Sequence, residues 1–176
     1  SAEPFRGLKR DIYEGGHHVP LIVKWPGLTK AGSVCDKLVS QIDFMATIAS
    51  ALKYSLPKNA AEDSHDLLPL LKGKNETPRT VHVHNTRADA WAIRVDEWNL
   101  ITGKSGYHSG RNQQWEEKRS YPADDKDSVE LYHYAKDPSQ RVNLAKKFPK
   151  KVAELQKALK DARDRGFTAP RLAGAR

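Results

Sequence analysis

The sequence predicts an α+β fold: a four-stranded antiparallel sheet with a packed C-terminal amphipathic helix, preceded by a strand and a helix. Three observations support this. Four short segments between residues 79 and 136 alternate apolar and polar residues, and most of their links are short and polar, which favours an antiparallel meander. From residue 149 the apolar residues recur at helical spacing. Before the sheet, the pattern changes from a continuous apolar run to a helical period.

The first expected element is a strand over residues 19–25, "VPLIVKW", which a Pro-Gly turn follows. Apolar residues at successive positions are typical of a strand that is covered on both faces. A helix is expected next over "SQIDFMATIASALKY", residues 40–54, where apolar residues recur three and four apart. A short helix over "DLLPLLKG", residues 66–73, follows, with Gly73 at its end.

The expected strands of the meander are "RTVHVHNT", "WAIRVDE", "WNLIT" and "VELYHYAK". Residues 106–128 interrupt them and show no clear pattern, so we expect no regular element there. The last helix begins at Pro149 and ends near Gly166. Its apolar stripe is formed by Val152, Leu155, Leu159 and Ala162.

Charge and composition restrict the function classes. The chain has 176 residues, with 30 Lys and Arg against 22 Asp and Glu, a net charge of +8. The basic residues are spread along the chain and no nucleic-acid-binding motif is found, so we expect a solvated basic surface and no nucleic-acid partner. No apolar run of about 18 residues or signal peptide is found, so no membrane association is expected. Cys35 has no second cysteine to pair with and is expected to be a half-buried small hydrophobe.

Two places carry candidate chemistry. Lys9 precedes a Gly15-Gly16 pair, and a lysine beside such a turn suits an anionic oxygen, although a solvated surface lysine has the same pattern. His82 and His84 stand two apart on one strand face, where they would bind a metal, contact a substrate or simply lie partly exposed.

Five motifs, taken in order, resemble the sulfatases of the arylsulfatase type over nearly the whole chain. They are "RGLKRDIYEGGHHVPLIVKWPG", "SQIDFMATIASALKYSLP", "DSHDLLPLLKGK", "WAIRVDEWNLI" and "VELYHYAKDPSQRVNLAKKFPKKVAELQKAL".

The resemblance implies a domain organisation and a chemistry. Residues 1–75 would be the C-terminal end of a catalytic α/β domain like that of alkaline phosphatase, and residues 76–176 a small domain of antiparallel sheet and helix. The parent protein would hydrolyse sulfate esters, sulfated sugars among them, with calcium and a formylglycine made from Cys or Ser in a C/S-x-P-x-R motif. Cys35 stands in "SVCDKLV", outside such a motif. We therefore expect a C-terminal sulfatase fragment that holds no metal and is inactive alone.

The resemblance also assigns site residues. Lys9 matches the family lysine that contacts a sulfate oxygen. His84 lies where some subfamilies place a histidine at the rim of the substrate pocket. Glu14, Gly15 and Gly16 match positions that fix the turn into the following strand.

Other interpretations remain open at this point. The positive charge and the segment "KSGYHSGRNQQWEEKR" also suit a module that binds sulfated glycans without catalysis, and a related phosphatase or phosphonate hydrolase is a weaker alternative. The family resemblance favours a periplasmic or secreted location. If residues 19–25 form an unpaired strand, its edge would favour self-association.

Overall fold

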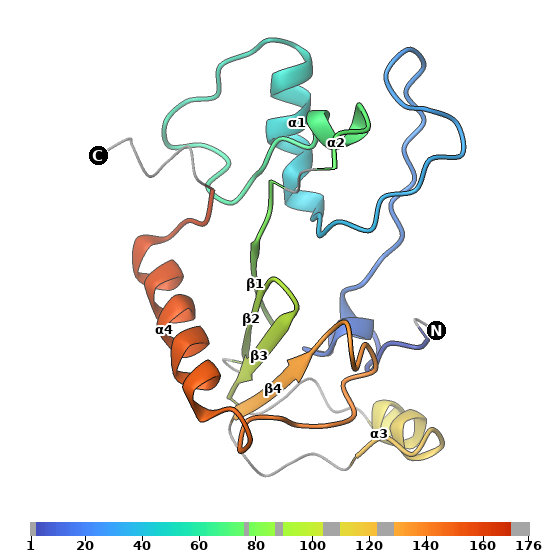
Figure 1. The fold of residues 1–176 in the computed structure, drawn as a ribbon, viewed down its shortest axis with the longest axis vertical. Coiled ribbons are helices and arrows are strands. Elements are labelled where there is room, and N and C mark those ends of the chain that lie inside the picture. Colours follow the sequence, from blue (N-terminus) through green and yellow to red (C-terminus); the bar gives the residue numbers. More distant parts are fainter. Residues whose placement is uncertain (1–2, 76–77, 87–89, 104–109, 123–128, 170–176) are drawn as a thin grey trace. The chain divides into compact units, whose positions relative to one another are not determined.

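The computed structural model describes residues 3–75, 78–86, 90–103, 110–122 and 129–169 (Figure 1). They form two compact units, residues 1–20 with 81–161 and residues 21–80 with 162–176. The helices and strands are, in chain order, η1 (Glu14–Gly16), η2 (Gln41–Asp43), α1 (Phe44–Ala51), α2 (Leu68–Leu71), β1 (Val81–Asn85), β2 (Trp91–Val95), β3 (Trp98–Thr102), α3 (Gly110–Glu117), β4 (Val129–His133) and α4 (Pro149–Arg165), where η marks a 3₁₀ helix.

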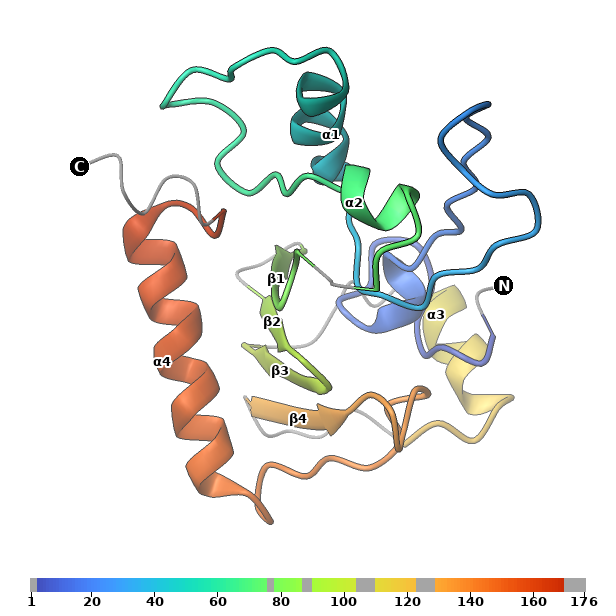
Figure 2. The same ribbon diagram turned by 45° about the horizontal axis from the view of Figure 1, so that its top comes forward.

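The first unit is built on one sheet with the order β1-β2-β3-β4, in which each strand pairs antiparallel with the next (Figure 2). The register aligns one apolar row across the sheet: Val83 is opposite Ile93, Ile93 is opposite Leu100, and Leu100 is opposite Leu131. The predicted meander and α+β class are confirmed.

Strand alternation gives the sheet two different faces. The row through Ile93, Leu100 and Leu131 packs against Leu155 and Leu159 of α4, which runs alongside the sheet in both views (Figures 1 and 2). Each of these five residues is at most 4 % exposed, and burying such a side chain contributes about 1.5–3 kcal/mol. The predicted C-terminal helix is confirmed, and it ends where Gly166 adopts a φ of +76°.

The other face of the sheet is covered by residues from the start of the chain. Ile12 and Tyr13 form a second buried cluster with Ala92, Ile101 and Tyr132. These strand residues are the direct neighbours of the row that faces α4, as a period of two requires. The sheet is therefore covered on both faces, by α4 and by the N-terminal segment.

In the second unit the helix expected over residues 40–54 is found as η2 followed by α1. Asp43 lies fully buried at their junction, where its carboxylate accepts a hydrogen bond from Ser40 N (2.8 Å) and forms an ion pair with Arg79. The short helix expected over residues 66–73 is confirmed as α2, which spans Leu68–Leu71. The predicted apolar stripe of α1 is only partly buried, because Ala46, Thr47 and Ala49 face inward whereas Met45, Ile48 and Leu52 are more than half exposed.

Two predictions of elements are wrong. Residues 19–25 form no strand, and Val19, Leu21, Ile22 and Val23 are exposed. A strand requires a neighbour to pair its backbone groups, and no strand of the described chain pairs with this segment. Residues 106–128 were expected to lack regular structure, but α3 forms there, and Trp115 stacks on Tyr121 with ring centroids 5.4 Å apart.

The chain passes from one unit to the other after Pro20, Thr80 and Asp161. Residues 1–20 belong with the sheet. The assignment of residues 1–75 to a larger catalytic domain stays a prediction. Among the helices of the described ranges, none has the length and apolar character that a membrane crossing would need.

Candidate functional site

Residues 5–16, which we term the N-terminal loop, carry Lys9. The loop folds back on itself: Asp11 N donates to Leu8 O (2.9 Å), and Gly15 N donates to Arg6 O (2.6 Å). A Cβ on Gly15 would lie 2.6 Å from Arg6 O, and one on Gly16 only 2.2 Å from Asp11 O. Both distances are too short for any side chain, so the glycine pair is required by the close approach of two backbone segments.

A buried ion pair anchors the start of the loop. Arg6, 2 % exposed, donates from Nε and Nη2 to the two carboxylate oxygens of Glu116 in α3, each at 3.2 Å. Its Nη2 also donates to Pro122 O (3.1 Å), and its guanidinium lies 3.8 Å from the ring centroid of Tyr13. A buried, bidentate ion pair of this kind fixes the orientation of the Arg6 side chain as well as its position.

A buried carboxylate in the sheet holds the end of the loop. Glu130 of β4 accepts hydrogen bonds from the hydroxyls of Tyr13 (3.0 Å) and Tyr132 (2.5 Å). Burial and the charge of Glu130 raise the pKa of Tyr132, so this phenol stays protonated and donates.

Three further side chains bond the backbone of the loop at alternate residues. Thr86 Oγ1 donates to Arg10 O (2.6 Å), and His84 Nε2 donates to Ile12 O (3.2 Å). Gln140 Oε1 accepts from the backbone N–H of Glu14 (2.7 Å).

Lys9, the predicted sulfate contact, is exposed on this anchored loop, directly before Arg10. The predicted substrate residue His84 is bonded to the same loop three residues further on. The structure therefore links the two predicted site residues through a short piece of backbone. Their contacts with a substrate stay predictions.

His84 belongs to a cluster of histidines on the loop face of β1. Its ring centroid lies 3.9 Å from that of His17 and 5.4 Å from that of His82. Burial, and after it the proximity of His17, lowers the pKa of His84 to about 3, so its imidazole is neutral near pH 7.

Glu14 lies beside this cluster. His18 Nδ1 is 2.9 Å from one of its carboxylate oxygens and His17 Nε2 is 3.5 Å from the other. Burial alone would raise the pKa of Glu14, but the hydrogen bonds from His17 and His18 hold it far below its usual value. The Glu14 carboxylate is therefore charged, and each of its oxygens faces one of the two histidines.

The residues that the structure describes do not fit a metal site. No group of three or more His, Cys, Asp or Glu side chains is placed to hold an ion within the described ranges. Cys35 is exposed, not half-buried as expected, and it lies outside the sequence motif of a formylglycine precursor. The described residues therefore bring together no such group of His, Cys, Asp or Glu, and Cys35 does not match the sequence motif of a formylglycine precursor.

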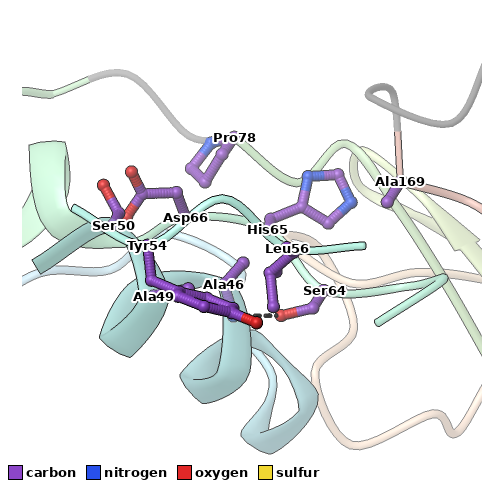
Figure 3. A pocket seen from close by; sticks show the side chains of 10 residues that line it. All are labelled: Ala46, Ala49, Ser50, Tyr54, Leu56, Ser64, His65, Asp66, Pro78 and Ala169. Atoms are coloured by element: carbon purple, nitrogen blue, oxygen red, sulfur yellow. Dashed lines mark hydrogen bonds between the residues drawn. The ribbon is translucent and has the colours of Figure 1, made fainter. Parts of the chain in front are cut away.

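The second unit contains a separate hollow of about 600 Å³ (Figure 3). Two of its polar side chains bond the backbone of the fold: Ser64 Oγ accepts from Ala46 N (2.9 Å), and Asp66 Oδ1 accepts from Leu68 N (2.8 Å). Neither predicted site residue lines it. The lining consists of Ala46, Ala49, Ser50, Tyr54, Leu56, Ser64, His65, Asp66, Pro78 and Ala169.

Comparison with known proteins identifies the family. Residues 7–165 match the family described as N-sulphoglucosamine sulphohydrolase, C-terminal. The chain belongs to this family. It therefore shares its fold with the C-terminal portion of sulfatases, which confirms the resemblance found in the sequence.

Individual relatives agree with this assignment. The chain is 34 % identical to an N-acetylgalactosamine-6-O-sulfatase of Bacteroides thetaiotaomicron, over 92 % of this chain and 30 % of that protein. It is 30 % identical to arylsulfatase K of Gallus gallus, over 86 % of this chain and 27 % of the relative. A solved structure from a study of glycosaminoglycan metabolism by B. thetaiotaomicron is 32 % identical, with a TM-score of 0.71, and covers 90 % of this chain and 32 % of its own. The chain thus spans about a third of the length of these relatives.

Sequence reasoning missed the residues that hold the loop. Arg6 and Glu116 are separated by 110 positions, and Glu14 and Gln140 by 126. No local pattern predicts such partners. The only signal in the sequence was the charged and glycine-rich character of the loop itself.

Proposed function

We propose that this chain is the C-terminal part of a sulfatase that hydrolyses sulfate esters of sugars. The observation that carries the proposal is the family match over residues 7–165, which includes the loop that holds Lys9. The sugar class follows from the name of the N-acetylgalactosamine-6-O-sulfatase, to which the chain is 34 % identical.

In this proposal Lys9 binds a sulfate oxygen. An ammonium group is a compact point charge that stabilises anionic oxygen, and its effect is larger where the charge grows in the transition state. The exposed side chain is free to meet a ligand, whereas the backbone below it is fixed by hydrogen bonds on both sides. A fixed backbone limits the reorganisation needed to place the charge.

His84 is proposed to lie beside the substrate in the complete protein. Its neutral imidazole, which is stacked on His82, suits a sugar or a hydroxyl group better than it suits the charge of a sulfate. Calcium and formylglycine, which the sulfatase family implies, are proposed to belong to the complete protein. A periplasmic or secreted location is proposed on the same family ground.

The test compares this 176-residue chain with a complete sulfatase that contains it. We expect the isolated chain to release no sulfate from N-acetylgalactosamine 6-sulfate or p-nitrophenyl sulfate in the presence of calcium, and the complete protein to release it. Turnover by the isolated chain would contradict its expected inactivity. Retention of the chain on heparin at low salt, with no turnover by the complete protein, would instead favour the glycan-binding module.

Lys9→Ala in the complete protein tests the role of the residue. We expect kcat/KM to fall by about 10²- to 10³-fold, the usual cost of losing one group that stabilises developing negative charge. Lys24→Ala is the matched control, because Lys24 is an exposed lysine outside the N-terminal loop. Equal activity of the two variants would remove Lys9 from the site.

A further inference from the structure

The backbone next to Lys9 adopts an unusual conformation. Arg10 has a φ of +80°, in the left-handed region that residues other than glycine seldom occupy. Such a residue persists only where its surroundings enforce the conformation, and it often marks a functional site. At Arg10 one such contact comes from Thr86, whose Oγ1 donates a hydrogen bond to the Arg10 carbonyl (2.6 Å).

The same pattern recurs along the segment that follows. The carbonyl of Ile12 is held by His84, and the amide of Glu14 by Gln140, which itself has a φ of +51°. The contacts thus fall on residues 10, 12 and 14, between the turn closed by the Asp11 N to Leu8 O bond and the start of η1 at Glu14. All three contacts on the loop backbone are made by side chains from distant parts of the chain.

We infer that Thr86 and His84, supported by Gln140, are positioning residues that fix the placement of the Lys9 ammonium. The inference rests on the proposed role of Lys9 in binding sulfate. Lys9 lies one peptide unit from the bond made by Thr86, so a change at Arg10 O alters the direction of the Lys9 side chain directly. Neither Thr86 nor Gln140 is required to touch the substrate for this effect.

His84 makes its contribution from a partly buried position on β1. Its Nε2 donates to Ile12 O while its ring packs against His17 and His82. The ring is thus held in place by neighbours on both the loop and the strand. The Ile12 side chain is fully buried against the sheet, and His84 bonds the backbone carbonyl of the same residue. Ile12 is therefore fixed through both its side chain and its backbone.

The decisive variants are at Thr86, because its two conservative replacements separate shape from hydrogen bonding. In the complete sulfatase, Thr86→Val keeps the shape and removes the hydroxyl, and we expect kcat/KM for p-nitrophenyl sulfate to fall by as much as about 10²-fold. Thr86→Ser restores the donor and is expected to restore most of the activity. Thr102→Val is the matched control, because Thr102 Oγ1 donates within the sheet, to Trp91 O (3.4 Å). A Thr86→Val enzyme as active as the wild type would overturn the inference.

A double-mutant cycle with Lys9→Ala shows whether Thr86 acts through Lys9. If it does, adding Thr86→Val to Lys9→Ala lowers kcat/KM little further, because the group that Thr86 positions is already absent. If the fold losses in kcat/KM of the two single variants instead multiply in the double variant, Thr86 acts independently of Lys9, which would contradict the inference.

Amide hydrogen exchange on the 176-residue chain tests the geometry without any turnover. We expect Thr86→Val to raise the exchange rate of the Asp11 amide, which is bonded to Leu8 O, by up to about tenfold. The amides of Ile93 and Leu100 should not change. Unchanged exchange at Asp11 would overturn the positioning of the loop by Thr86. A Lys9→Ala enzyme of full activity would instead overturn the proposed role of Lys9 in binding sulfate, whatever the exchange at Asp11.

Discussion

Within the first 25 residues, a polar segment is buried and an apolar segment next to it is exposed, the reverse of what hydropathy predicts. The N-terminal loop, residues 5–16, is rich in charge and glycine, yet Arg6, Ile12 and Tyr13 are at most 2 % exposed. Residues 19–25 are mostly apolar, yet Ile22 is 91 % exposed.

The difference shows that burial depends on the partners available and not on hydropathy alone. Buried polar groups of the loop have specific partners from distant parts of the chain, such as Glu116 for Arg6 and Glu130 for Tyr13. In the apolar segment the side chains find no such surface within the described part of the chain, and the backbone finds no strand to pair with.

The largest expected effect comes from breaking the ion pair that anchors the loop. Arg6→Ala leaves the carboxylate of Glu116, itself 8 % exposed, without its bidentate partner. Removing one member of a buried pair typically costs about 3–5 kcal/mol. We expect a loss of this size in the free energy of unfolding, measured by urea denaturation of the 176-residue chain.

An exposed ion pair on α4 is the control. Lys157 Nζ lies 2.6 Å from Asp161 Oδ2, but the two side chains are 76 % and 46 % exposed. Lys157→Ala should therefore cost less than about 1 kcal/mol. If Arg6→Ala costs no more than Lys157→Ala, the loop is not anchored by its buried charge.

A smaller effect is expected from pH, through His84. Its pKa is lowered to about 3 in the folded chain, mainly by burial, against about 6.5 when unfolded. Between these values the unfolded state binds more protons, so stability is full above about pH 6.5 and is lost as the pH falls toward 3. The slope contributed by one such group is at most about 1.4 kcal/mol per pH unit.

His84→Gln isolates this contribution. The carboxylate of Glu14 also loses stabilising interactions in acid, but its ordinary pKa is about 4.3, so its effect begins lower. The titratable groups that face His84, namely His17, His82 and Glu14, remain in the variant. We expect the free energy of unfolding of His84→Gln to depend less on pH than that of the wild type between pH 5 and 6.5; parallel curves would show that His84 is not buried as a neutral group.

The same contrast explains what the sequence could predict. The strands β1 to β4 and the helix α4 were predictable because each has a regular apolar period and finds its partner nearby in the chain. Residues 19–25 have an equally strong pattern, but a strand also requires a neighbour, which a local pattern does not contain. The helix α3 was not predictable, because its sequence has weak apolar periodicity. It packs instead through a long-range contact, in which Glu116 pairs with Arg6, 110 positions earlier.

The candidate site divides in the same way. Lys9 and His84 could be proposed from the sequence because residue type and motif are local properties. Their connection could not, because it depends on Thr86, Ile12 and the positive φ of Arg10. The side-chain contacts that fix a loop come from tertiary structure, and they leave little trace in the order of residues.

The smallest effect on stability is expected in the exposed apolar segment. Ile22→Ser should change the free energy of unfolding by less than about 0.5 kcal/mol, because a side chain that is 91 % exposed loses little on replacement. Ile12→Val in the loop, at 0 % exposed, should cost about 0.5–1.5 kcal/mol although it removes only one methylene.

We also expect the 176-residue chain to self-associate through the exposed residues of 19–25, because contiguous exposed apolar groups favour association. This mechanism requires no strand edge, unlike the one first expected from the sequence. Sedimentation velocity of the wild type and Ile22→Ser decides it: a strictly monomeric wild type would contradict the association, and equal association of both would place the contact elsewhere.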